Sequence, residues 1–291
     1  MTAMATPEQT QTMVCYRHPS NETAITCSNC GRPICTDCMV FAPVGIKCPE
    51  CAGQPTGAKK AAGKARSYTS VGTDFIVTKT LIGINVLVFL VQVVQSGSFT
   101  QPFSEIFFRG ALAAPPIAQA DQWYRIVTCA FLHGSVLHIF FNMLMLWWFG
   151  RPLEHLLGRG RFLAIYFISI LAGSAGALLI NPTTFTVGAS GAVFGILGAG
   201  LILERHNINV FGGSALIIVI LNLALSFTLN NVSIGGHVGG LVGGALCVFA
   251  FSSFGRGHAV HGRFNVLTAL SLVAIAAGSV LIAYFKVRGY A

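Results

Sequence analysis

The sequence predicts an all-α polytopic membrane protein preceded by a small cysteine-rich domain. Hydrophobic residues make up 54% of the 291 residues and charged residues only 9%, whereas soluble domains carry about 25% charged residues. Seven apolar stretches follow residue 75, and seven of the nine cysteines lie before residue 52. This composition excludes an ordinary soluble enzyme, and it also excludes disorder over most of the chain.

The cysteine-rich segment contains four pairs of candidate metal ligands, each with two residues between its members. The pairs are Cys15 with His18, Cys27 with Cys30, Cys35 with Cys38, and Cys48 with Cys51. Eight such ligands suit two tetrahedral Zn²⁺ ions of the structural kind. The alternative is a disulfide framework, which a cytoplasmic location disfavours. Because the segment offers no nucleophile beside a base, we expect a structural or partner-binding module here.

This segment resembles a B-box-type zinc finger over roughly residues 13–52. The resemblance implies a cross-braced arrangement, in which the first and third pairs share one zinc ion and the second and fourth pairs share the other. It also implies that the module binds a protein partner.

A basic linker is expected over residues 53–74, which are rich in Gly, Ala, Lys and Ser. It divides the chain into a zinc-binding domain (1–52), the linker (53–74) and a membrane domain (75–291). Eight of the 18 Lys and Arg lie at or before Lys79. Basic residues beside a first span set topology or contact membrane lipids more often than they bind nucleic acid, so we expect no nucleic-acid partner. The polar start of the chain predicts no signal peptide and a cytoplasmic N-terminus.

The seven apolar stretches predict seven membrane helices. Their approximate bounds are 76–95, 136–151, 161–180, 190–204, 213–229, 235–253 and 264–285. Several are shorter than the roughly 20 residues of a simple span, which is tolerated inside a bundle. With the N-terminus inside, the inner loops carry Arg151, Arg159, Arg161, Arg205, Arg256 and Arg263. The outer loops carry Arg109 and Arg125, and Lys286 and Arg288 at the outer C-terminus count against the rule. The positive-inside rule therefore supports a multi-pass protein of the cell membrane. Amphipathic helices are expected in the long loop 96–135.

Polar residues within these stretches are candidate functional groups. His138 and Asn142 are four residues apart and share one helical face. Ser190 lies between Gly188 and Gly191 where an outer loop enters a span, and His237 lies one turn into the sixth span. All four polar residues are expected near the outer ends of their helices, in one layer.

These residue types indicate nucleophilic catalysis. A serine hydroxyl needs a base, and His237 is the best-placed one for Ser190. The side chains of His138 and Asn142 and the Ser190 amide can stabilise an oxyanion. The acids after residue 100 map away from this layer, so we expect a dyad in which packing holds His237. Those acids are Glu105, Asp121, Glu154 and Glu204.

Small residues predict how the serine and histidine helices meet. Gly236, Gly240 and Gly244 repeat every four residues, and the serine helix has the same spacing at Gly191, Gly195 and Ala199. Such stripes allow two helix backbones to approach closely.

Over residues 75–285 the sequence resembles the rhomboid intramembrane serine proteases. The matching motifs are Trp123-x-Arg125, His133, His138-x3-Asn142, Gly150-x3-Glu154, Gly188-x-Ser190-Gly191 and Gly236-His237-x2-Gly240-x3-Gly244. The resemblance implies a six-helix core plus a seventh span, with Ser190 as nucleophile and His237 as general base. It implies oxyanion stabilisation by His138, Asn142 and the Ser190 amide, and structural roles for Trp123, Arg125 and Glu154. Substrates would be transmembrane proteins, and catalysis would need no cofactor.

Two other classes of protein remain as alternatives. One is a catalytically inactive rhomboid-like protein that binds membrane clients, with a zinc-dependent head that docks a partner; inactive relatives usually lack the serine or the histidine. The other is a transporter or channel, which intramembrane histidines and glycine-interrupted spans permit, although a carboxylate-lined pathway and an inverted repeat are not evident. Cys129 and Cys247 are interpreted as small buried hydrophobic residues.

Overall fold

The computed structural model describes residues 13–41, 45–52, 75–228, 232–252 and 265–290. The chain divides into two compact units, Met1–Thr73 and Asp74–Ala291. The expected linker 53–74 lies outside the described residues, as do Arg256 and Arg263.

In its described residues, 13–41 and 45–52, the first unit contains two antiparallel strand pairs and one 3₁₀ turn. Strand β1 (Met13–Val14) pairs with β2 (Glu22–Thr23), and β3 (Val40–Phe41) pairs with β4 (Ile46–Lys47). The turn η1 spans Thr36–Cys38. Among the described residues of this unit, the buried hydrophobic cluster consists of five cysteines and Ile34. A unit of this size with so little apolar core needs a metal or another cross-link to be stable.

The second unit is helical, and each of the seven predicted apolar stretches forms a helix. The helices are α2 (Ile76–Ser96), α6 (Val136–Met145), α8 (Arg159–Ile180), α9 (Ser190–Arg205), α10 (Ala215–Thr228), α11 (Ile234–Phe251) and α12 (Val266–Val287). Helix α6 continues through a π-helical turn, η3 (Leu146–Gly150), into α7 (Arg151–Leu157). A short 3₁₀ turn, η4 (Arg288–Tyr290), follows α12.

Four of these helices, α2, α8, α11 and α12, are individually long and apolar enough to cross a membrane. A fifth span results in the described part of the chain if residues 125–131 and 136–157, which meet at 93°, count as one broken segment. Helices α9 and α10 have only 16 and 14 residues. The short α9 is mostly buried among its neighbours, which is the setting in which a short helix is tolerated at membrane depth.

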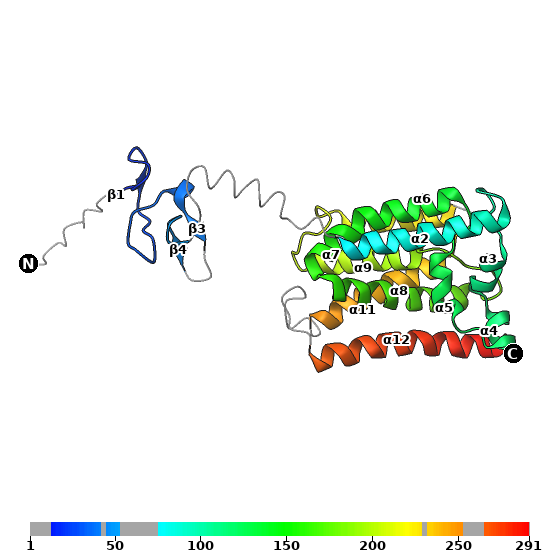
Figure 1. Ribbon diagram of the computed structural model, residues 1–291. Coiled ribbons are helices and arrows are strands. Elements are labelled where there is room, and N and C mark those ends of the chain that lie inside the picture. The colour runs from blue at the N-terminus through cyan, green and yellow to red at the C-terminus, as the bar shows by residue number, and fades with distance from the viewer. Residues whose placement is uncertain (1–12, 42–44, 53–74, 229–231, 253–264, 291) are drawn as a thin grey trace, which may run out of the picture. The chain divides into compact units, whose positions relative to one another are not determined.

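Helices α8, α9 and α11 pack together at the centre of the bundle, and α12 lies along its side against α8 (Figure 1). Glycines permit the close approach. A Cβ atom added to Gly240 would lie 2.7 Å from the carbonyl carbon of Gly191, and one added to Gly244 would lie 2.6 Å from the Cα of Gly195. The predicted close contact between the serine helix and the histidine helix is therefore confirmed.

The long loop between α2 and α6 is helical, as predicted. It contains α3 (Glu105–Gly110), α4 (Ala114–Ala120), α5 (Arg125–Thr128) and the 3₁₀ turn η2 (Cys129–Phe131). The buried guanidinium of Arg125 donates to the carbonyl oxygens of Phe108 and Ala111 at 2.7 and 2.6 Å. The Trp123 ring stacks on Tyr284 of α12. Both residues therefore hold the loop in place, which is the structural role expected of them.

Glu154 joins α7 to the start of α2. Its carboxylate accepts hydrogen bonds from the backbone N–H groups of Val77 and Thr78 at 3.0 and 2.9 Å, and from the Thr78 hydroxyl at 2.7 Å. An anion at a helix N-terminus satisfies amides that have no partner within the helix. The expected role of Glu154 as a structural hydrogen-bonding partner is thus confirmed.

Candidate active site and metal-ligand clusters

The first turns of α6, α9 and α11 carry the candidate catalytic residues. Ser190 is the first residue of α9, His138 lies in the first turn of α6, and His237 is the fourth residue of α11. The leading amides of each helix have no partner within that helix, and the helix dipole adds positive potential there. The arrangement therefore favours developing negative charge at this end of the three helices.

Gly188 brings the His138 ring next to the chain that leads into Ser190. Gly188 has a φ of +121°, a conformation that favours glycine. A Cβ atom at this position would lie 2.6 Å from the His138 Nε2 atom. The absence of a side chain at Gly188 therefore leaves the space that the imidazole occupies, two residues before Ser190.

The hydrogen bonds of His138 indicate where its proton lies. The backbone N–H of Gly134 donates to His138 Nδ1 at 3.4 Å. A neutral imidazole that accepts at Nδ1 carries its proton on Nε2, which is the atom beside Gly188. Asn142 donates one amide hydrogen to the His138 carbonyl oxygen at 2.9 Å and has a second one to offer. Both side chains can therefore act as hydrogen-bond donors, and the His138 ring lies beside Gly188, two residues before Ser190.

His237 lies against the face of α9 that carries Ser190. Its ring stacks on Phe194 with a centroid separation of 4.1 Å and an angle of 16°, and Phe194 is four residues after Ser190 on the same helical face. The Ser190 hydroxyl and the His237 ring are not hydrogen-bonded to each other, although catalytic hydrogen bonds are often long before substrate binds.

A side chain that the sequence did not indicate also contacts His237. The Ser226 hydroxyl of α10 lies 2.7 Å from His237 Nδ1. The expectation that packing holds His237 is therefore incomplete: besides Phe194, a hydroxyl from a third helix contacts the ring nitrogen that an aspartate contacts in a triad. Nothing in the apolar stretch around Ser226 distinguishes this serine from one that only bonds its own helix.

Gln92 of α2 is a second residue that the sequence analysis missed. Its side chain donates to the His133 carbonyl oxygen and accepts from the His133 backbone N–H, both at 3.1 Å. The His133 ring then packs edge-on against His138, with centroids 5.1 Å apart. A glutamine within a predominantly apolar span was the available signal.

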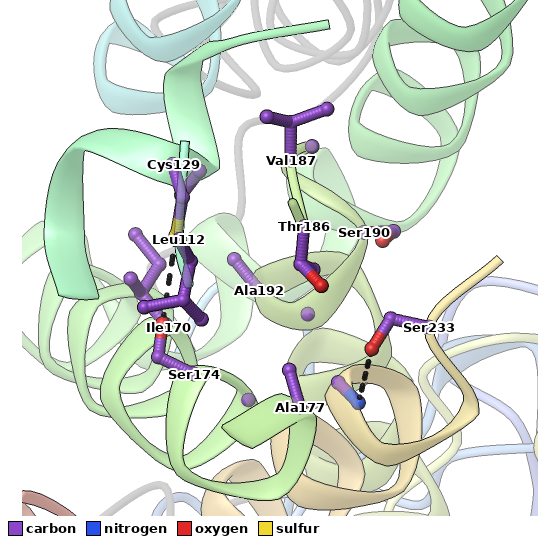
Figure 2. Close-up of a pocket in the computed structure, with 15 residues that line it drawn as sticks. Leu112, Cys129, Ile170, Ser174, Ala177, Thr186, Val187, Ser190, Ala192 and Ser233 are labelled. Atoms are coloured by element: carbon purple, nitrogen blue, oxygen red, sulfur yellow. Dashed lines mark hydrogen bonds between the residues drawn. The ribbon is translucent and has the colours of Figure 1, made fainter. Parts of the chain in front are cut away.

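A small cavity opens beside Ser190 (Figure 2). Figure 2 shows the hydroxyl groups of Thr186, Ser190 and Ser233 around it. Its volume is about 30 Å³. A cavity needs a volume of about 10–15 Å³ to hold one water molecule, and that water needs two to four polar partners. The cavity therefore has room for water next to the candidate nucleophile.

The cysteine-rich unit contains two clusters of four ligands. Cys15, His18, Cys35 and Cys38 form the first cluster, and Cys27, Cys30, Cys48 and Cys51 form the second. Within each cluster the ligand atoms lie within 4.8 Å of one another. The first pair thus joins the third, and the second joins the fourth, which is the cross-braced arrangement that the resemblance implied.

The spacing of these atoms suits a tetrahedral metal ion. Cys30 Sγ and Cys48 Sγ are 3.7 Å apart, and Zn–S bonds of about 2.3 Å at tetrahedral angles separate two sulfurs by about 3.8 Å. His18 Nδ1 lies 3.3, 3.4 and 3.9 Å from the sulfurs of Cys35, Cys38 and Cys15. All nine cysteines are free thiols, so the structure does not support the disulfide framework. Cys129 and Cys247 are buried, as predicted.

The surroundings of the cluster thiols affect their protonation. Burial opposes ionisation of Cys27, but hydrogen bonds from the backbone of Cys48, Cys30 and Asn29 lower its pKa to about 6. Burial and the neighbouring thiols of Cys15 and Cys35 raise the pKa of Cys38 to about 12. Since metals bind thiolates, each cluster contains groups that must lose protons before all four ligands can bind an ion.

Comparison with known proteins places the similarity in the helical unit. Residues 120–254 match the Rhomboid domain family. Rhomboid protease GluP of Bacillus subtilis (strain 168) is 36% identical over 205 residues, which cover 69% of this chain and 39% of GluP. Rhomboid-like protease 3 of Toxoplasma gondii is 30% identical over 182 residues, covering 58% of this chain and 68% of that protein. RHOMBOID-like protein 1 of Arabidopsis thaliana is 35% identical over 148 residues, which cover 49% of this chain and 38% of that protein. The chain thus spans well under half of two of these relatives.

Proposed function

This chain belongs to the rhomboid family, and we propose on that premise that it is an intramembrane serine protease that cleaves transmembrane proteins. The family and the apolar helices make it an integral, multi-pass membrane protein. The single observation that supports the activity is that Ser190, His138 and His237 lie in the first turns of three helices, with Gly188 beside the His138 ring and Phe194 stacked on His237.

The proposed reaction uses a Ser190–His237 dyad. His237 takes the proton of the Ser190 hydroxyl while the oxygen attacks the carbonyl carbon of the scissile peptide bond. The protonated His237 then gives this proton to the leaving amine, and the C–N bond breaks to leave an acyl-enzyme. A water molecule then attacks the acyl carbon and gives a proton to His237. The ester C–O bond then breaks, His237 returns the proton to the Ser190 oxygen, and the second product leaves with a new carboxyl group.

The oxyanion that forms in both steps is assigned to three donors: the side chains of His138 and Asn142 and the Ser190 amide. Removing one such donor in a serine protease costs about 10²–10³ in kcat. Because Gly134 donates to Nδ1 of His138, the neutral ring carries its proton on Nε2. This proton supports the proposal that His138 donates a hydrogen bond to the oxyanion.

For the cysteine-rich unit we propose two structural zinc ions, one in each cluster, in a domain of residues 1–52. The linker 53–74 would join it to the membrane domain 75–291. Structural zinc supplies folding energy to a unit with little apolar core. We assign this domain a docking or regulatory role toward a protein partner, and we place the N-terminus on the cytoplasmic side of the cell membrane, with membrane lipids around the helical unit.

The test is cleavage of a model transmembrane substrate by the purified full-length protein, with Ser190→Ala as the matched variant. Cleavage by the wild type and not by the variant is the expected result. Cleavage by both would assign the nucleophile elsewhere. Failure of the wild type both to cleave and to react at Ser190 with a fluorophosphonate would favour the alternative, a catalytically inactive protein that binds membrane clients.

A further inference from the structure

Ser226 connects α10 to the candidate base. Its side chain is buried, with 4% of its surface exposed, and its hydroxyl oxygen lies 2.7 Å from His237 Nδ1. Most of α10 faces outward through large apolar side chains such as Leu221 and Leu225. Ser226 is therefore a buried polar group on a helix that exposes mainly hydrocarbon.

The second hydrogen bond of Ser226 determines the direction of the first. Its oxygen lies 2.8 Å from the backbone carbonyl oxygen of Asn222, one turn earlier. A carbonyl only accepts, and a serine hydroxyl has one proton to donate. That proton goes to Asn222, so the oxygen of Ser226 accepts a hydrogen bond from Nδ1–H of His237.

This direction selects one tautomer of His237. A neutral imidazole with its proton on Nδ1 has its lone pair on Nε2. Phe194 covers one face of the ring and Ser226 binds Nδ1, so the ring is constrained both in its plane and across it. The nitrogen that is left to accept the Ser190 proton is Nε2.

We infer that Ser226 is a positioning residue that sets the tautomer and orientation of His237, in the place that an aspartate occupies in a catalytic triad. The inference rests on the proposed function for its kinetic consequence, but the tautomer is a property of the resting protein. When His237 takes the proton from Ser190, Nδ1–H remains bonded to the hydroxyl oxygen of Ser226, and a hydrogen bond from a charged donor is the stronger one.

Ser279 on α12 is a matched control for the possibility that Ser226 only bonds its own helix. Ser279 of α12 is also buried, and its hydroxyl donates to the carbonyl oxygen of Ile275, four residues earlier, at 2.9 Å. It repeats the bond between Ser226 and Asn222 in a setting where no histidine is bonded to it. Loss of the Ser279 hydroxyl therefore measures the effect of the local bond alone.

The experiment compares Ser226→Ala, Ser226→Thr and Ser279→Ala in the full-length protein. We expect Ser226→Ala to lower kcat about 10-fold with KM unchanged, since alanine removes a hydrogen bond that becomes stronger when His237 is protonated. Ser226→Thr keeps a hydroxyl that can bond the carbonyl four residues earlier and should restore most of the activity. Ser279→Ala should leave kcat within about twofold, because it removes the local bond and nothing else.

The second readout is ¹⁵N NMR of histidine-labelled protein, with the His237 signals assigned by their loss in His237→Asn. The wild type is expected to be protonated at Nδ1, and Ser226→Ala should move the proton toward Nε2. An unchanged tautomer in Ser226→Ala, or an equal loss of kcat in Ser279→Ala, would overturn the inference. If the wild type neither cleaves nor reacts at Ser190, the proposed function fails, and the tautomer measurement still decides whether Ser226 sets the proton on His237.

Discussion

Replacing Gly240 by alanine should separate the two helices that carry the candidate dyad. The new Cβ would lie 2.7 Å from the carbonyl carbon and 3.0 Å from the Cα of Gly191, whereas carbon atoms in contact are about 3.5–4.0 Å apart. To remove this overlap, α9 and α11 must move apart by about 1 Å, because backbone atoms cannot rotate away as a side chain can. Overpacking of this kind typically costs about 1–3 kcal/mol, and a 1 Å misplacement of reacting groups can cost about 100-fold in rate.

The assay pairs kcat for a model transmembrane substrate with the melting temperature in detergent. Gly240→Ala is expected to lose about 100-fold in kcat and to melt at a lower temperature. Gly83→Ala and Gly278→Ala are the controls, because a Cβ at either position meets no atom within 4 Å. A Gly240→Ala protein with the kcat and melting temperature of these controls would refute the argument that the glycine contact brings Ser190 and His237 together.

Three further perturbations test other parts of the molecule. Glu154→Gln should lower stability by about 1–3 kcal/mol, measured by denaturant titration, since it weakens hydrogen bonds to buried donors at the start of α2; an unchanged midpoint would contradict this. Zinc affinity should rise with pH, and zinc uptake at pH 7 should release protons, because the pKa of Cys38 is raised to about 12 while that of Cys27 is lowered to about 6. Calorimetry in buffers of different ionisation enthalpy measures this release, and an affinity equal at pH 6 and pH 8 would oppose it. Deleting residues 1–60 should leave cleavage of a simple substrate largely intact; complete loss in a folded truncation would make the head part of the catalytic unit.

Much of the fold could be predicted from local patterns. The bounds of the helices agree with the apolar stretches to within a few residues, apart from α6, which continues through η3 into α7. This agreement arises because hydrophobic runs and glycine spacing act over a few turns of one helix. The four ligand pairs of the cysteine-rich unit could also be predicted from a local pattern, since two residues between ligands allow both to reach one ion.

The candidate site was predictable where its residues lie in short motifs. Ser190 between two glycines, and His138 four residues before Asn142, stand out in a sequence with few polar residues. Phe194 could have been found from its spacing of four residues after Ser190.

By itself, the sequence determined the helices, the ligand pairs and the polar residues available for chemistry. Only the tertiary structure decided that Ser226, rather than packing alone, engages His237, and that Gln92 holds the backbone of His133. The first contact joins α10 to α11, and the second joins α2 to the loop before α6, so each depends on how separate segments are rotated and how closely they approach. That geometry follows from side-chain packing across the whole bundle, which no local pattern in the sequence records.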